Sequence, residues 1–353
     1  MDKAMDKYNI AIFFGGCSSE YIVSLESAYA VICNINRALY RPVLIGITQE
    51  GNWLHFSGDA EKIKKDIWKE DESCVPALLS PDKGAHTLFL QKPNGMESIS
   101  IDAVLPILHG KNGEDGTIQG MIELAGIPLA GCGTLSSALC MDKDRAHKLV
   151  GLAGVRVPKS MVLEANMPAG QAADFGEAVG YPLFVKPVKA GSSYGITKVS
   201  QPETLMDAIS LAFQYDNQVI LEENIDGFEV GCAILGVHTL TVGEVDEIEL
   251  SDGFFDFTEK YTLKTSAIHV PARIPAEKAE EIKRTAKVIY RALDCSGFAR
   301  VDMFLTPDGE IVFNEVNTIP GFTEHSRYPG MMKAAGISFS EMLERILRQA
   351  VIS

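Results

Sequence analysis

Residues 300 to 317 read RVDMFLTPDGEIVFNEVN, a pattern that predicts two strands joined by a turn. Proline, aspartate and glycine at 307 to 309 favour reversal of the chain. Apolar residues recur in both strands, which indicates a buried hairpin rather than a solvated edge with ordinary surface charges; these are Val301, Met303, Val312 and Val316. The hairpin is therefore expected within a packed sheet.

The same hairpin carries a guanidinium, two carboxylates and a carboxamide, from Arg300, Asp302, Glu315 and Asn317. Mg²⁺ takes hard oxygen ligands, usually one or two carboxylates completed by phosphates and water. An arginine nearby offers a fork to a phosphoryl group or a developing oxyanion. The hairpin therefore predicts a magnesium-phosphate site.

Whether the four side chains meet depends on the register of the hairpin. Side chains alternate across a strand, so Arg300 and Asp302 share one face, as do Glu315 and Asn317. A two- or four-residue loop puts both pairs on the same side, whereas a three-residue loop with a bulge at Gly309 puts them on opposite sides. The sequence leaves both registers open.

Composition limits the class of protein. The 353 residues suffice for two or three domains, and a net charge of -15 with a pI near 5.0 argues against nucleic acid or an anionic membrane surface as partners. No apolar run approaches a membrane span, and residues 1 to 7 lack a signal-peptide core, so the cytoplasm is the expected location. Seven scattered cysteines without CxxC spacing predict neither disulfides nor a zinc site.

Changes in pattern divide the chain into an α/β substrate domain at 1–130, a central domain at 131–217 and a C-terminal domain at 218–353. In the first, strands, glycine turns and helices alternate, which is typical of a parallel sheet covered by helices. The capping box Ser338-x-x-Glu341 predicts a last helix. Strands are expected at 8–14, 42–48, 101–108, 156–162, 183–188, 196–199, 219–223, 229–234 and 239–248, besides the hairpin.

Three loops are candidates for ligand contacts. Residues 191–195, GSSYG, follow Lys186 and suit a phosphate, because glycines admit backbone N–H groups and a buried lysine needs an anionic partner, although a plain hairpin turn is the alternative. Glu20 and His109 follow strands of the first domain, where open α/β sheets bind ligands. Residues 110–120, GKNGEDGTIQG, read equally well as a tight turn or as part of a site.

Seven stretches together resemble the D-alanine:D-alanine ligases, in order and over nearly the whole chain: GGCSSE (15–20), LHGKNGEDGTIQG (108–120), SALCMDK (137–143), VKPVKAGSSYG (185–195), EKY (259–261), ARVDMF (299–304) and NEVNTIPGFT (314–323). The resemblance implies a three-domain ATP-grasp fold, an α/β architecture in which the central and C-terminal sheets enclose ATP. The sequence of residues 131–148 and 314–332 looks closer to the VanG type of vancomycin-resistance ligase, which joins D-alanine to D-serine.

The resemblance implies roles for individual residues. Glu20, Ser192 and Tyr261 would form a hydrogen-bonded trio around the first D-alanine, beside His109, and Arg300 with the Gly321 N–H would stabilise the oxyanion. Two Mg²⁺ ions, or Mn²⁺, would be held by Asp302, Glu315 and Asn317. The expected ATP contacts are Lys143, Lys186, Ser193, Glu222, Glu223, Ile225 and Glu229.

The second substrate is expected to be D-serine. Ser326 would receive its carboxylate, Arg327 its hydroxyl, and Phe255 would form another wall; a structural ion-pairing role for Arg327 is the alternative. Residues 249–265, with Lys260 and Tyr261, are the expected lid. The family usually has an acidic residue two positions after Glu20, where this chain has Ile22.

Other functions stay open at this stage. The alternatives are a housekeeping D-alanine:D-alanine ligase, a catalytically silent ATP-binding module, and an ATP-grasp ligase for another carboxylate. The intact set of predicted metal and phosphate residues argues against a silent module. A homodimer is what the family suggests.

Overall fold

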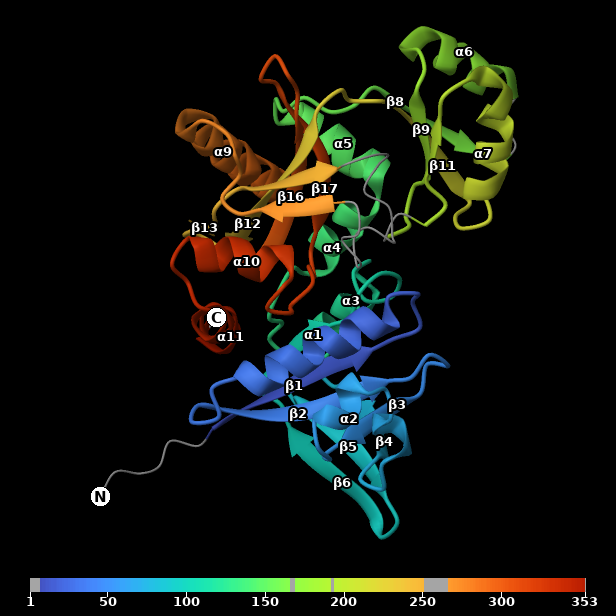
Figure 1. Cartoon of the computed structure of the whole chain (residues 1–353). Coiled ribbons are helices and arrows are strands. Elements are labelled where there is room, and N and C mark those ends of the chain that lie inside the picture. Colours follow the sequence, from blue (N-terminus) through green and yellow to red (C-terminus); the bar gives the residue numbers. More distant parts are fainter. Residues whose placement is uncertain (1–6, 166–168, 192–193, 251–265, 353) are drawn as a thin grey trace.

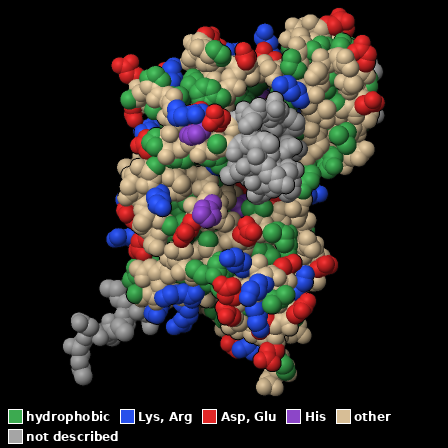
Figure 2. Space-filling model, in the orientation of Figure 1, with side chains coloured by type: hydrophobic (Ala, Val, Ile, Leu, Met, Phe, Trp, Pro, Cys, Tyr) green, Lys and Arg blue, Asp and Glu red, His purple; other side chains and the backbone are tan. Residues whose placement is uncertain are grey.

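The structure is a computed structural model that describes residues 7–165, 169–191, 194–250 and 266–352. It contains three sheets, and the predicted α/β architecture is confirmed (Figure 1). Within these ranges, no helix has both the length and the apolar character needed to span a bilayer. Figure 2 shows acidic and basic side chains interspersed over one face.

The first sheet has the order β6-β5-β4-β3-β2-β1-β7. Only β1, β2 and β7 run parallel, and the other strands pair antiparallel. The three strands predicted here correspond to β1, β2 and β7 and run parallel as predicted; strands β3 to β6 were not predicted, and they pair antiparallel with their neighbours in sequence and need no helical crossover. The bounds are β1 (Tyr8–Gly15), β2 (Tyr40–Ile47), β3 (Trp53–Phe56), β4 (Val75–Leu79), β5 (Thr87–Lys92), β6 (Gly95–Ser100) and β7 (Ala103–Ile107).

Helices cover this sheet and link it to the end of the chain. Apolar residues of α1 and α11 share one core with β1 and β7, so the C-terminal helix packs on the first sheet. Helix α11 begins directly after Ser338, the first residue of the predicted capping box. Glu341 N–H, in the first turn, donates to Ser338 Oγ at 3.3 Å. The bounds are α1 (Tyr21–Asn34), α2 (Glu61–Lys64), α3 (Thr117–Leu124) and α11 (Phe339–Ile352).

The second sheet is antiparallel, with the order β10-β9-β11-β8, and α6 and α7 pack against it. Strand β11 was assigned to the C-terminal domain, but it lies between β8 and β9. Its position depends on pairing with distant strands, which local pattern does not reveal. The bounds are β8 (Ser160–Glu164), β9 (Leu183–Pro187), β10 (Thr197–Val199), β11 (Gln218–Glu223), α6 (Ala169–Val179) and α7 (Leu205–Ala212).

The third sheet has the order β15-β14-β12-β16-β17, with β13 paired to β12. The strand predicted at 239–248 is two strands. It is interrupted at Gly243 and Glu244, whose N–H groups donate to Ala233 O and Met331 O. Helices α4, α5 and α9 share its core. The bounds are β12 (Phe228–Leu235), β13 (Thr241–Val242), β14 (Asp246–Leu250), β15 (Ser266–His269), β16 (Phe298–Leu305), β17 (Ile311–Asn317), α4 (Thr134–Met141), α5 (Lys143–Leu152), α9 (Ala276–Ala292) and α10 (Arg327–Ala334).

The β16–β17 hairpin has the three-residue loop yet keeps its polar side chains together. Thr306 N–H bonds Glu310 O, and Gly309 has a φ of 87°. This loop alone would put the two polar pairs on opposite faces. However, the register shifts between Asp302 and Met303, so that Asn314 is an extra residue. This bulge pairs Asp302 directly with Glu315, and Arg300 with Asn317, on one face.

The close fit of β2 against Trp68 gives a stability test. A Cβ added at Gly46 would overlap the fully buried Trp68 ring and lie 2.8 Å from Phe14 Cζ. We expect Gly46→Ala to lower the free energy of unfolding by about 1–3 kcal/mol, because a packed core cannot yield without strain. Urea unfolding followed by circular dichroism measures the change.

The control for this substitution is Gly170→Ala in α6, where the new Cβ meets no atom of the described residues within 4 Å. There we expect no loss, and a gain of up to about 1 kcal/mol from helix propensity. Equal unfolding free energies for the two variants would contradict the packing around Trp68.

Candidate functional site

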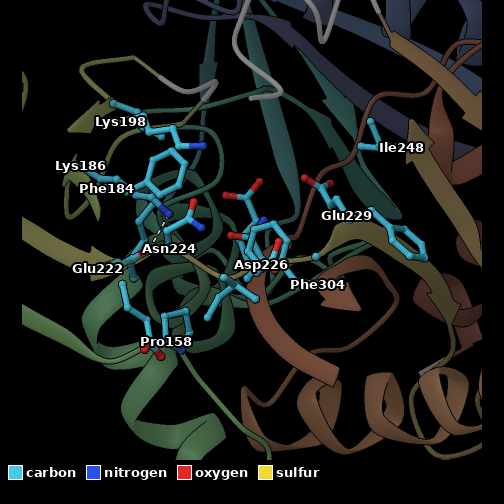
Figure 3. A pocket seen from close by; sticks show the side chains of 18 of the residues that line it. Pro158, Phe184, Lys186, Lys198, Glu222, Asn224, Asp226, Glu229, Ile248 and Phe304 are labelled. Carbon is cyan, nitrogen blue, oxygen red and sulfur yellow. Dashed lines mark hydrogen bonds and ion pairs between the residues drawn. The ribbon is translucent and has the colours of Figure 1, made fainter. Parts of the chain in front are cut away.

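A cleft of about 480 Å³ lies between the second and third sheets (Figure 3). Its volume is within the usual range for small-molecule sites. Six predicted ATP contacts and one predicted metal ligand line it, so the fold brings together residues from 143 to 315: Lys143, Lys186, Glu222, Glu223, Ile225, Glu229 and Glu315.

The cleft combines apolar walls with cationic side chains. Phe184, Ile248 and Phe304 project into it in Figure 3. Lys186 Nζ and Lys198 Nζ lie 5.4 Å and 5.9 Å from the centre of the Phe184 ring. The lysines and Phe184 suit a flat aromatic group that carries negative charge, although seven acidic residues also line the cleft.

Lys186 and Glu222 form an ion pair inside the cleft, with Nζ to Oε2 at 2.5 Å (Figure 3). Burial opposes ionisation of Glu222, but Lys186 and His147 outweigh it and hold the pKa of Glu222 below its usual value. Lys143 begins α5, and its Nζ donates to Ala190 O at 2.8 Å. Ala190 directly precedes residues 191–195, the glycine-serine loop. Both lysines therefore lie at the end of the cleft where phosphates were predicted.

Glu223 is held by the neighbouring strand. Its N–H donates to Lys159 O, and its Oε1 accepts from Lys159 N–H, each at 2.9 Å. One carboxylate oxygen and the main-chain N–H of Glu223 are therefore bound by the protein, and its contact with ATP stays a prediction. Ile225 lines the cleft without a polar contribution from its side chain.

Asp302 is the most enclosed of the predicted metal ligands, at 1% exposed. Arg300 donates to it from Nε at 2.8 Å and from Nη2 at 2.6 Å, and Asn317 Nδ2 donates at 2.9 Å. Burial raises the pKa of Asp302, but the charges of Arg300 and Arg327 prevail and lower it. The carboxylate is therefore ionised, and both of its oxygens accept hydrogen bonds from Arg300.

The donor set fits Mg²⁺ in company with a substrate. Across the described ranges there is no group of three or more histidine, cysteine or acidic side chains that could hold a metal alone. Two carboxylates and a carboxamide, from Asp302, Glu315 and Asn317, are what Mg²⁺ takes when phosphates and water complete its shell. Their common face is set by the bulge at Asn314.

Arg327, the predicted hydroxyl donor to D-serine, has its guanidinium occupied by ion pairs within the protein. Its guanidinium is buried, and Nε and Nη2 bind both oxygens of Asp246 at 2.7 Å and 2.9 Å. Nη1 donates to Glu229 at 2.6 Å, and Nη2 lies 3.4 Å from Asp302 Oδ1. The structure supports the ion-pairing alternative, because three carboxylates already occupy this guanidinium. Glu229, a predicted ATP contact, is one of them.

His109 is buried, and both of its ring nitrogens have protein partners. Nδ1 lies 2.8 Å from Ile319 O, and Nε2 lies 3.3 Å from Ser27 Oγ. Burial lowers the pKa of His109 to about 4, so the ring is neutral. That it lies beside the first substrate stays a prediction; its hydrogen bonds are made to the protein.

Glu114 and Ser27 belong to the site but were missed by sequence reasoning. Glu114 Oε1 accepts from Ile319 N–H at 3.1 Å, and Oε2 accepts from Gly110 N–H at 2.8 Å. Burial and the charge of Glu20 raise the pKa of Glu114 to about 8. A carboxylate between glycines, in GKNGEDG, was the available signal for Glu114, whereas Ser27 looks like any small residue on a helix.

Glu20 lies where the first sheet meets the glycine-serine loop. It is 8% exposed, and a Cβ added at Gly191 would lie 3.0 Å from Glu20 Oε2. Glycine at 191 therefore permits the close approach that the predicted trio requires. Its other members, Ser192 and Tyr261, lie outside the described residues, as do Ser193, Phe255 and Lys260 and most of the predicted lid.

Ser326 and Gly321 lie together after β17. A Cβ added at Gly321 would lie 2.9 Å from Ser326 Oγ, which also accepts from Thr323 N–H at 3.1 Å. Ser326 is the N-cap residue of α10, so its surroundings favour an anion. A role in binding a carboxylate remains a prediction for Ser326.

Two family models match the chain. The one described as D-ala D-ala ligase N-terminus matches residues 9–132, and the one described as D-ala D-ala ligase C-terminus matches residues 149–348. Together they span most of the chain, in the order that the sequence motifs predicted.

Individual relatives match over nearly their whole length. The chain is 45% identical to the Vancomycin B-type resistance protein VanB of Enterococcus faecalis, over 98% of this chain and 99% of that protein. It is 41% identical to a D-alanine–D-alanine ligase of Caldicellulosiruptor bescii, over 98% and 96%. The crystal structure of VanG D-Ala:D-Ser ligase from Enterococcus faecalis is similar, with a TM-score of 0.91 and 57% identity over 97% of this chain and 99% of that one.

The ion pairs of Arg327 give a test of the network. Arg327→Met leaves Asp246 buried without its cation, and we expect the free energy of unfolding to fall by about 3–5 kcal/mol. The matched control is Arg345→Met, which removes an exposed pair with Glu341 on α11 and should cost about 0.5 kcal/mol or less. Guanidinium unfolding of both variants measures the difference, and similar losses would contradict a structural role for Arg327.

Proposed function

The chain belongs to the D-alanine–D-alanine ligase family, and we propose that it uses ATP to join D-alanine to D-serine. The observation that carries the choice of D-serine is the 57% identity, over 97% of this chain, to a structure described as a D-Ala:D-Ser ligase. Identity to VanB and to the D-alanine–D-alanine ligase cited above is lower, at 45% and 41%. The product would be the terminal dipeptide of a peptidoglycan precursor with reduced affinity for vancomycin.

We place ATP in the cleft between the second and third sheets. Phe184 and Phe304 would enclose the base, and Lys143 and Lys186 would bind the phosphates. The Lys186–Glu222 pair is compatible with this, because Glu222 has a second oxygen for the adenine amine while Lys186 faces the phosphates. Glu229, fixed from behind by Arg327, would address the ribose.

Asp302, Glu315 and Asn317 would hold the Mg²⁺ that this family uses with ATP. When bound, the metal neutralises charge on the transferring phosphoryl group. The residues of the chain do the positioning, since Arg300 keeps Asp302 in one orientation and the bulge at Asn314 turns Glu315 toward the same cleft. The carboxylate of D-alanine then attacks the γ-phosphate to give D-alanyl phosphate and ADP.

In the second step the amine of D-serine attacks the acyl phosphate and phosphate leaves. The tetrahedral oxyanion would lie against Arg300 and the N–H of Gly321. Ser326, at the start of α10, would receive the carboxylate of D-serine. The 249–265 segment, with Lys260 and Tyr261, would exclude water from the acyl phosphate. The protein would act as a homodimer with both substrate amino acids bound in each subunit.

The metal assignment predicts the effect of Glu315→Gln. A carboxamide supplies an oxygen but no charge, so Mg²⁺ binding and turnover should fall by at least about 100-fold while the fold is kept. Phosphate release at increasing MgCl₂ measures this. Near-normal activity at low magnesium would contradict the assignment.

The substrate assignment is tested by phosphate release and product analysis with D-alanine alone and with D-alanine plus D-serine or D-lactate. We expect D-alanyl-D-serine to form with the highest kcat/KM. Equal kcat/KM for D-serine and D-alanine would identify a housekeeping ligase. Absence of any D-alanine-dependent phosphate release would point to a silent module or to another carboxylate.

A further inference from the structure

The loop after β17 is held by three side chains of the N-terminal domain. Ile319 N–H donates to Glu114 Oε1 at 3.1 Å, Ile319 O lies 2.8 Å from His109 Nδ1, and Phe322 N–H donates to Ser27 Oγ at 3.2 Å. The partners are more than 200 residues apart in the chain. The loop is therefore fixed by another domain.

Donors and acceptors in this set are consistent with a single arrangement. Ile319 O only accepts, so Nδ1 of the neutral His109 carries the proton. Nε2 then accepts from the Ser27 hydroxyl, at 3.3 Å, while Ser27 Oγ accepts from Phe322. Removing the Ser27 hydroxyl breaks both links and leaves two buried polar groups unsatisfied.

The bonds flank Gly321 on both sides. Ile319 and Phe322 have their N–H groups engaged, and Pro320 has none. Gly321 N–H has no acceptor among the residues that the structure describes. It is thus the one amide of the 319–322 segment left for a ligand.

We propose that Ser27, His109 and Glu114 are positioning residues that fix the main chain of 319–322 and thereby aim the Gly321 N–H at the reacting carbonyl. The inference rests on the proposed function, in which this N–H stabilises the oxyanion. Half of the oxyanion site is then built by the third sheet, through Arg300, and half is oriented by the N-terminal domain.

The two chemical steps depend differently on this orientation. Transfer of the γ-phosphate to the D-alanine carboxylate creates no tetrahedral carbon, whereas attack of the amine does. A misaimed Gly321 N–H therefore slows the second step and spares the first. A merely structural role would change both steps together.

The test is Ser27→Ala, measured on both steps. The first step is followed with D-alanine alone, by ATP labelled with ¹⁸O in the β–γ bridge, because reversible phosphoryl transfer moves the label to the other β oxygens. The second is followed as dipeptide formed with D-serine. We expect scrambling within about twofold of the unmodified protein and dipeptide formation lowered by roughly 10- to 100-fold.

The matched control is Ser137→Ala. Ser137 on α4 is fully buried, and its hydroxyl has no hydrogen-bond partner within the described ranges. Both rates should stay at those of the unmodified protein. If Ser27→Ala does not fold, Glu114→Gln is measured in its place, since its amide group can accept only one of the two N–H bonds.

Equal losses in scrambling and dipeptide formation, or no loss in either, would overturn the positioning role while leaving the ligase assignment intact. An unmodified protein that neither scrambles label nor forms dipeptide would instead overturn the proposed function, and the positioning role with it. The ratio of the two rates separates these outcomes.

Discussion

The carboxylate of Asp302 is held by two arginines and an asparagine, and the candidate site is arranged around that contact. Arg300 and Asn317 bind it from the hairpin, and Arg327 reaches it from α10. Arg327 also binds Asp246 of β14 and Glu229 of β12. A buried charge without a partner is costly. Strands β12, β14, β16 and β17 and helix α10 must therefore keep their relative positions.

The site as a whole needs all three sheets. The second and third sheets enclose the cleft proposed for ATP, and the first domain supplies Glu20, His109 and Glu114. Contacts across the sheets are made at close range: glycine at 191 leaves room for Glu20, and Ile319 is bonded by two side chains of the first domain. The geometry of the candidate site therefore depends on how the three sheets pack against one another.

Sequence reasoning succeeded where the signal was local. The hairpin, the strand before Lys186 and the capping box of α11 were readable because each depends on neighbours in sequence. It failed where distant partners decide. The position of β11, the antiparallel part of the first sheet and the burial of Arg327 all depend on pairing across many residues. The loop with Glu114 reads equally well as a turn or as part of a site, because the acceptor role of Glu114 requires the backbone of Ile319, which is distant in sequence.

The bulge at Asn314 makes the site sensitive to the parity of chain length. While the bulge is kept, loss or gain of one residue between Met303 and Asn314 turns Glu315 and Asn317 to the far side of the hairpin, since each step along a strand reverses the side chains. Loss of the bulge together with that change restores the original side. A one-residue change in this turn therefore keeps the site only when the bulge is lost with it.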